Sequence, residues 1–195
     1  EMTEKADRII IKLSPMLDWQ KAASDIENVS EVHIVSVGNE CKELLLVIDK
    51  KAEHLKVFCV NDDQIFSYTS NDEIRNFYQQ PSNPRYLYEP NASVMKAGCF
   101  QLIAQRFGIS QPDKNSHLFL SEQTIPDFPG RGFVIERVCT MNKRELKTGL
   151  AGIPQANIAV RNFPLSVADL RKRLKLKDGG EVYIFATTSA EKGHL

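Results

Sequence analysis

The stretch that most limits how this chain can fold is residues 156–188, which predict a strand, a helix and a second strand in succession. Ile158 and Val160 form a short apolar run that favours the first strand. Ser166 then stands where a helix N-cap is expected, with Asp169 at the acidic position of a capping box. A strand that leads directly into a capped helix is the opening of a βαβ unit.

The predicted helix carries apolar residues at helical spacing and is followed by a pair of glycines. Its apolar positions are Val167, Leu170 and Leu174. Residues 179–180 are both glycine, which favours a left-handed helix stop. The residues after them alternate as a strand with two partly covered faces would, with Val182, Ile184 and Ala186 against Tyr183, Phe185 and Thr187. The C-terminal part of the chain is therefore predicted to be a small α/β module.

The same helix is strongly basic along one flank. Residues 156–177 contain six cations and a single acid. At about 100° per residue, three of the cations fall together beside the apolar stripe: Arg171, Lys172 and Lys175. Arg161, at the end of the preceding strand, extends this patch. We interpret these four residues as candidate contacts to phosphate groups. The alternative is an ordinary solvated face on which long side chains cover apolar neighbours.

The overall composition excludes several classes of protein. Lys and Arg together number 25, as do Asp and Glu, so the formal net charge is zero and any preference for an anionic partner must be local. The longest apolar runs, such as residues 44–48, are far too short to cross a membrane. The four cysteines are widely separated and lack a histidine at ligand spacing, which predicts no metal site. Scattered thiols of this kind favour a reducing, cytoplasmic setting.

The first part of the chain has the pattern of the closing portion of an open α/β sheet that ends on an antiparallel strand. Residues 8–13 form a compact apolar strand of the kind buried in a parallel sheet, and a helix capped by Asp18 is expected over residues 19–28. Two pairs of alternating runs follow, each around turn residues; the first is a β-hairpin or a close antiparallel neighbour pair, and the second is a hairpin. Their strands are predicted at residues 31–37 with 43–48, and at 55–60 with 64–69. A short helix is then expected, with an apolar side formed by Ile74, Phe77 and Tyr78.

Residues 81–84, Pro-Ser-Asn-Pro, are the best candidate for a domain boundary, because two prolines and two turn formers separate periodic segments. They divide the chain into residues 1–80 and residues 81–195. Beyond them, Asn91 is expected to cap a single helix that runs to Phe107.

Two further elements are expected between that helix and residue 156. Residues 133–139 predict a strand. Asn142 and Glu145 form a second capping box, which opens a helix that extends to Leu150.

Four stretches of the chain together resemble a known family. They are IIIKLSPMLD at 9–18, SEVHIVSVGNECKELLLVID at 30–49, RYLYEPNASVMKAG at 85–98 and VRNFPLSVADLRKRLKLKDGG at 160–180. In this order they resemble the C-terminal portion of bacterial class I S-adenosylmethionine-dependent methyltransferases that carry a THUMP-like C-terminal domain. The resemblance runs over nearly the whole chain.

This resemblance implies a fold, a cofactor and a substrate. Residues 1–80 would be the last strands and a helix of a truncated Rossmann-like methyltransferase domain, and residues 81–195 would be a THUMP-like α/β domain. Members of this family use S-adenosylmethionine, and THUMP domains as a class bind RNA, so the parent protein is implied to methylate RNA.

The family's glycine-rich cofactor loop and its acidic, proline-containing catalytic motif do not occur in this sequence. The chain also begins with Glu1 and not with an initiator Met. We therefore expect a fragment that is not catalytic by itself and binds no S-adenosylmethionine alone. Its partners would be RNA and the missing N-terminal part of the same protein, with no metal and no membrane.

Two short segments supply candidate substrate-side residues. Ser14, Pro15 and Met16 follow the carboxyl end of the first strand, where open α/β sheets bind ligands, although a proline that simply ends a strand is the alternative. Glu89 and Asn91 are placed near the methyl-transfer site by the resemblance, although an extended entry and a helix N-cap would account for them equally well. No residue of this chain is assigned as catalytic.

Two classes of function remain open at this stage. The parent is either a methyltransferase or a non-catalytic module that binds nucleic acid or protein. For the methyltransferase, the resemblance implies an RNA substrate, and the residues leave protein or a small metabolite open. The sequence upstream of Glu1 would separate them, because a glycine-rich loop followed by an acidic-proline motif belongs only to the enzyme.

Overall fold

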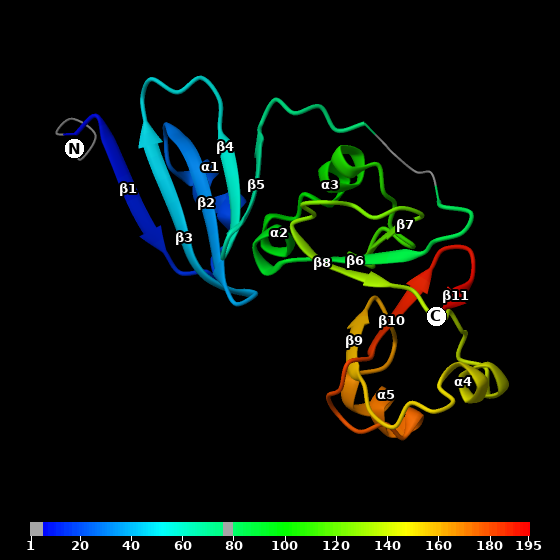
Figure 1. Ribbon diagram of the computed structural model, residues 1–195. Coiled ribbons are helices and arrows are strands. Elements are labelled where there is room, and N and C mark those ends of the chain that lie inside the picture. Colours follow the sequence, from blue (N-terminus) through cyan, green and yellow to red (C-terminus); the bar gives the residue numbers. More distant parts are fainter. Residues whose placement is uncertain (1–5, 76–79) are drawn as a thin grey trace. The chain divides into compact units, whose positions relative to one another are not determined.

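A computed structural model describes residues 6–75 and 80–195, and within them the chain is a mixed α/β protein with one five-stranded and two three-stranded sheets (Figure 1). Two compact units divide the chain. The first is built from the described residues of 1–77, 89–108 and 125–131. The second is built from those of 78–88, 109–124 and 132–195.

The five-stranded sheet belongs to the first unit. Its elements are β1 (Arg8–Leu13), α1 (Trp19–Asp25), β2 (Val29–Val37), β3 (Glu40–Asp49), β4 (Lys56–Asn61) and β5 (Gln64–Thr69). The strand order is β1-β3-β2-β4-β5. β3 runs antiparallel to both β1 and β2, and β4 is parallel to β2 and antiparallel to β5. Both predicted hairpins are therefore confirmed.

The structure corrects two details of this region. β1 was expected to be a buried strand of a parallel sheet, but it pairs antiparallel with β3 and its residues alternate between exposed and half-buried. An apolar run indicates that both faces of a strand are apolar. It does not identify which strand pairs with it or in which direction. The predicted helix over 19–28 ends at Asp25, because the next residue, Ile26, is already extended with φ of −117° and ψ of 127°. Asn28 then takes a left-handed φ of 61° immediately before β2.

One face of the sheet forms the core of the first unit. Val32 lies opposite both Leu46 and Val57, and Ile34 lies opposite both Leu44 and Cys59, so these side chains share a face, and all are buried. Two helices, α2 (Ala92–Ala97) and α3 (Phe100–Phe107), follow in the chain, and α2 packs against β2, β3 and β4.

The junction of the two helices also contacts the sheet. A hydrogen bond with Cys99, and then burial, raises the pKa of the Cys59 thiol above its ordinary value. These two helices replace the single helix that was expected from Asn91 to Phe107. Asn91 does cap α2, but Gly98 takes a left-handed φ of 72° and ends it. Gly108 then ends α3 after Phe107, the residue at which the predicted helix ends.

The remaining strands lie mainly in the second unit. β6 (Tyr86–Pro90), β7 (Phe119–Ser121) and β8 (Gly130–Val134) form a sheet in the order β7-β6-β8, and the division between the units falls within β6 and β8. After α4 (Lys143–Gly149) come β9 (Asn157–Arg161), α5 (Val167–Leu174), β10 (Tyr183–Ser189) and β11 (Gly193–His194). β9 and β10 are parallel and joined by α5, which confirms the predicted strand–helix–strand succession.

Several predicted boundaries in this unit are wrong. The strand expected over 133–139 is β8, which ends at Val134. α5 ends at Leu174, where Lys175 itself takes the left-handed conformation with φ of 58°, and the glycine pair at 179–180 is left-handed only later. In the second capping box, the Asn142 side chain accepts from the Arg144 amide, as an N-cap does. The Glu145 carboxylate, however, accepts from the amide and hydroxyl of Thr140 and not from the Asn142 amide that a capping box would use.

Two predictions concern the segment between the hairpins and β6. The helix expected around Ile74, Phe77 and Tyr78 falls partly on residues 76–79, outside the described residues, and residues 72–75 are not helical. The boundary at residues 81–84 stays a prediction.

Gly130 is the position in the first unit where a glycine is most tightly required. An added Cβ would overlap the backbone oxygen of Glu89 and lie 2.8 Å from the Cα of Pro90. Because both obstacles are backbone atoms, they cannot rotate away. We expect Gly130→Ala to lower the free energy of unfolding by about 3 kcal/mol, the upper end of the usual range for overpacked sites.

Gly38→Ala is the matched control, since Gly38 has a left-handed φ of 56° but open space around it. It should cost only about 1–2 kcal/mol from backbone strain. Urea unfolding of both variants measures the difference, and an equal or smaller loss for Gly130→Ala would contradict the close approach.

Candidate functional site

The loop after β1 presents the first group of predicted site residues. Ser14 closes a turn, because its carbonyl accepts from the Leu17 amide at 3.2 Å and its hydroxyl accepts from the Met16 amide at 3.3 Å. Pro15 is half-buried in this turn, whereas the Met16 side chain is 87% exposed. Of these three residues, Met16 is the one that borders a pocket.

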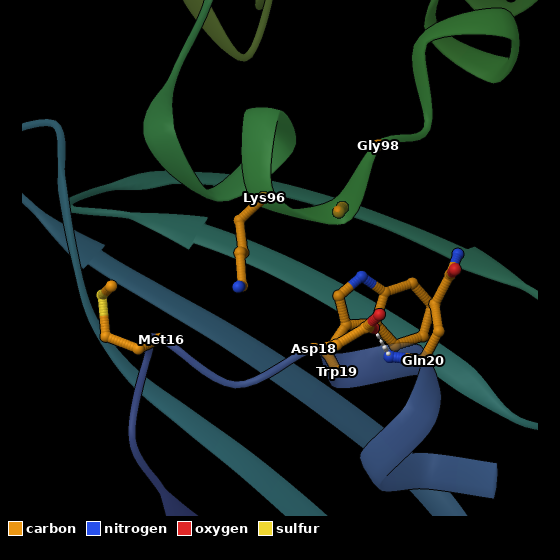
Figure 2. A pocket seen from close by; sticks show the side chains of 7 residues that line it. Met16, Asp18, Trp19, Gln20, Lys96 and Gly98 are labelled. Atoms are coloured by element: carbon orange, nitrogen blue, oxygen red, sulfur yellow. Dashed lines mark hydrogen bonds between the residues drawn. The ribbon is translucent and has the colours of Figure 1, made fainter.

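That pocket has a volume of about 490 Å³ and lies between the N-terminal end of α1 and the C-terminal end of α2 (Figure 2). It is lined by Met16, Asp18, Trp19, Gln20, Lys96, Ala97 and Gly98. Figure 2 shows the Lys96 side chain extending from α2 toward Met16 and Trp19. The left-handed Gly98 ends α2 two residues after Lys96.

Some polar groups of the pocket already have hydrogen-bond partners within the protein, and others do not. The Oδ1 atom of Asp18 accepts from the amides of Gln20 at 2.9 Å and Lys21 at 3.3 Å, as the predicted N-cap of α1. The Lys96 ammonium, the Trp19 indole N–H and the side-chain amide of Gln20 make no hydrogen bond within residues 6–75 and 80–195. The pocket therefore offers mainly unused donors.

Glu89, the second candidate region, is a buried carboxylate at 4% exposure. Its Oε2 atom accepts from the Arg131 guanidinium at 2.6 Å, and about half of the Arg131 side chain is exposed. A buried carboxylate requires such a partner, because an unpaired charge in the interior is strongly unfavourable. The ion pair gives Glu89 a structural role in the first unit.

Asn91, next to it, is also buried and has several hydrogen-bond partners. Its side-chain oxygen accepts from the Val94 amide at 3.1 Å and the Ser93 hydroxyl at 2.7 Å, and its side-chain nitrogen donates to Gln64 at 2.9 Å. Gln64 in turn donates to the Gly130 carbonyl at 3.0 Å. These contacts are those of the helix cap that was the alternative reading of Asn91.

In residues 156–177, called the basic segment below, Arg171 makes contacts that its neighbouring cations do not make. Its guanidinium donates to the carbonyls of Ala156 and Lys177, each at 3.0 Å, and to the Asp178 carboxylate at 2.6 Å. The side chain is 22% exposed. These bonds hold the start of β9 to the segment after α5. Arg171 as a phosphate contact stays a prediction that its intramolecular bonds do not favour.

The other predicted phosphate contacts have different surroundings. Lys172 is exposed on α5, and Lys175 is exposed at its left-handed end. Arg161 is half-buried at the end of β9 and donates to its neighbour's carbonyl at 3.3 Å. Burial, and then the nearby Arg161 charge, lower the pKa of His117. The exposed part of the basic segment therefore consists of four cations: Lys172, Arg173, Lys175 and Lys177.

Comparison with family profiles gives two consecutive matches. Residues 86–129 match a ferredoxin-like domain, and residues 130–195 match a domain described as THUMP domain-like. The chain therefore contains a ferredoxin-like and a THUMP-like domain. The basic segment lies wholly within the THUMP-like domain, and the Lys96 side of the pocket belongs to the ferredoxin-like match. No curated protein matches the chain.

The chain is also similar to a solved structure. A crystal structure from Porphyromonas gingivalis W83, described as a "putative methyltransferase", matches 96% of this chain at 35% sequence identity and a TM-score of 0.86. The match covers 49% of that protein, so this chain spans about half its length.

Neither a metal cluster nor a membrane span is found where the structure describes the chain. In residues 6–75 and 80–195, no three His, Cys, Asp or Glu side chains are grouped so that they could hold a metal ion. None of the described helices is long and apolar enough to cross a bilayer.

Sequence reasoning missed Trp19 and Lys96 as pocket residues. Trp19 is the single tryptophan of the chain and directly follows the candidate loop, so its position was a usable signal. Lys96 gave no such signal, because it lies in an apolar helix and reaches the pocket only through the packing of α2 on the sheet.

Arg171→Gln tests the structural role of Arg171. The change removes the donor to two carbonyls and to a carboxylate, and we expect it to lower the free energy of unfolding by about 1–3 kcal/mol. Arg173→Gln, at an exposed neighbour on the same helix, should change it by less than about 0.5 kcal/mol. Thermal unfolding of both variants is the measurement, and equal effects would show that the Arg171 bonds contribute no net stability.

Proposed function

We propose that this chain is the C-terminal part of an S-adenosylmethionine-dependent methyltransferase of class I that acts on RNA. In this proposal the THUMP-like domain binds the RNA, and a segment outside the chain holds the cofactor. The observation that carries the proposal is the similarity to the P. gingivalis structure, which extends over 96% of this chain and only half of that one. A methyltransferase of that length would have room for the cofactor-binding half.

The topology of the five-stranded sheet supports this proposal. β1 and β2 run in the same direction with the antiparallel β3 between them. This is the arrangement expected at the closing edge of a Rossmann-like methyltransferase sheet. In the described residues β1 pairs on one side only, and its Ile10 side chain is 64% exposed. An open edge with an apolar side chain is suited to a further strand from the proposed upstream segment.

The two exposed isoleucines of this sheet point to the same proposal. Ile10 lies opposite Val47 on β3, and Ile65, which is 68% exposed, lies opposite Val60 on β4. The registers put both on the face opposite the core face described above. Since methyltransferase sheets of this kind are covered on both faces, the exposed side chains are accounted for by helices of the upstream segment.

The sequence and the geometry of such sheets support a cofactor site held mainly outside this chain. Ligands bind outside the carboxyl ends of the strands, and Ser14, Pro15 and Met16 stand at the carboxyl end of β1. The glycine-rich loop and the acidic-proline motif do not occur in these 195 residues. The chain would then border the site from the substrate side, and the cofactor would be held by the upstream segment.

A direct consequence concerns the affinity of the isolated chain for S-adenosylmethionine. Because the main cofactor-holding residues lie outside the chain, we expect no saturable binding at micromolar cofactor. Isothermal titration calorimetry with cofactor at millimolar concentration is the measurement. A micromolar dissociation constant would mean that the cofactor site lies within this chain.

The RNA part of the proposal rests on the THUMP-like domain and its exposed cations. The chain has no net charge, yet Lys172, Arg173, Lys175 and Lys177 are exposed within six residues of the THUMP-like domain. Contacts from such residues to phosphates position RNA without reading its sequence, and they release counterions on binding.

The alternative is a non-catalytic nucleic-acid or protein interaction module. The absence of both methyltransferase motifs from this sequence favours it for the chain taken alone. A nucleic-acid-binding module would share RNA binding by the basic segment with the methyltransferase, so only methyl transfer by the longer protein would separate these two. A protein-interaction module would show neither activity.

Replacing Lys172 and Lys175 together with Gln tests the RNA contacts. We expect weaker RNA binding across sequences and a salt slope, log affinity against log salt concentration, that flattens by about 0.7 per lost contact to single-stranded RNA. Lys143→Gln with Lys147→Gln on α4 is the matched control, because it removes two exposed lysines of the same domain. Fluorescence anisotropy at several salt concentrations measures both. Equal affinities and slopes for the two double variants would remove the basic segment from the RNA site.

A further inference from the structure

The pocket between α1 and α2 is lined by hydrogen-bond donors that have no partner among the residues that the structure describes. Lys96 is half-buried, makes no ion pair within residues 6–75 and 80–195, and extends toward Met16 and Trp19 (Figure 2). Trp19 is 8% exposed, so its indole is held in place by the fold, and its N–H has no hydrogen bond in the same residues. A fixed N–H and an unpaired ammonium together favour an anionic acceptor.

The other groups of the pocket define what kind of anion fits. Asp18 is the acid of the lining, and its Oδ1 atom is already bonded to the two amides of the α1 cap. Met16 exposes a flexible apolar side chain at the rim, which suits a flat or irregular apolar surface on the ligand. The volume of about 490 Å³ falls within the range of small-molecule sites, which is larger than a lone inorganic ion requires.

We propose that this pocket binds one nucleotide through its phosphate, with Lys96 as the charged contact and the Trp19 N–H as a second donor. Met16 then covers the base or the ribose. This inference rests on the proposed function, in which the RNA substrate supplies the nucleotide at the carboxyl end of β1. A free mononucleotide presents the same chemistry, and the test distinguishes the two sources.

The single tryptophan makes the pocket directly observable. Trp19 lines it and the chain has no other tryptophan, so tryptophan fluorescence reports on this site alone. The chain is titrated with AMP, with a short single-stranded RNA of mixed sequence, and with adenosine, which lacks the phosphate. We expect a saturable change in emission with the RNA and with AMP, and none with adenosine at the same concentrations.

Two variants assign the phosphate contact. Lys96→Gln should weaken binding about tenfold or more, because a hydrogen bond between charged groups is lost. Lys56→Gln is the matched control, since Lys56 is an exposed lysine at the start of β4 and does not line the pocket. Unchanged emission of the unliganded Lys96→Gln protein, relative to the parent, shows that the pocket itself is intact.

Each outcome has a defined meaning. No saturable change with RNA or AMP, equal binding by the two lysine variants, or a response to adenosine equal to that of AMP would overturn the proposal. A response to RNA supports a substrate site, and a response to AMP alone supports a site for free nucleotide. This binding requires no methyl transfer, so a nucleotide-binding chain whose longer protein methylates no RNA would contradict the proposed function and leave the pocket assignment standing.

Discussion

A buried amide, Asn91, is the contact on which the arrangement of the first unit depends. Its side chain caps α2 and bonds to Gln64 on β5, and its backbone amide donates to the Pro129 carbonyl at 3.0 Å. Gln64 continues the network to Gly130, where only a glycine fits against the backbone of Glu89 and Pro90. Three segments far apart in the sequence are thus fixed together. Removing one hydrogen bond of this network leaves buried polar groups unpaired, and each such group lowers the free energy of unfolding by about 1–3 kcal/mol.

The placement of α2 by this network has a functional consequence. α2 carries Lys96 to the pocket beside the loop after β1, and Gly98 ends the helix there. Asn91 and Glu89, which the sequence suggested as substrate-side residues, therefore act in our account by holding the scaffold. The groups that face the pocket are their neighbour Lys96 and the residues Met16 and Trp19.

Much of the fold could be predicted from local patterns. Both hairpins, the caps at Asp18, Asn91 and Ser166, and the parallel βαβ unit all follow from signals within a few residues of one another. The predictions that failed depend on competition that the local pattern does not reveal. Gly98 divides a continuous apolar helix stripe, and Lys175 ends α5 in the left-handed conformation before the glycine pair is reached.

The candidate site was harder to predict, because it depends on contacts between distant residues. Helical periodicity put Arg171 beside Lys172 and Lys175, yet Arg171 reaches the carbonyl of Ala156, 15 residues away. A periodic pattern gives the direction of a side chain and not the groups that it meets. The pocket is even harder to predict from local patterns. Its two sides lie in different parts of the sequence, and only the packing of α2 on the sheet brings them together.

The central claim is that this chain belongs to an enzyme that transfers a methyl group to RNA. The most direct measurement uses the longer protein with S-adenosylmethionine carrying a radiolabelled methyl group and total bacterial RNA. Our account predicts label in the RNA fraction, which ribonuclease removes and protease does not. Label that enters protein or a small molecule, or no transfer at all, would contradict it.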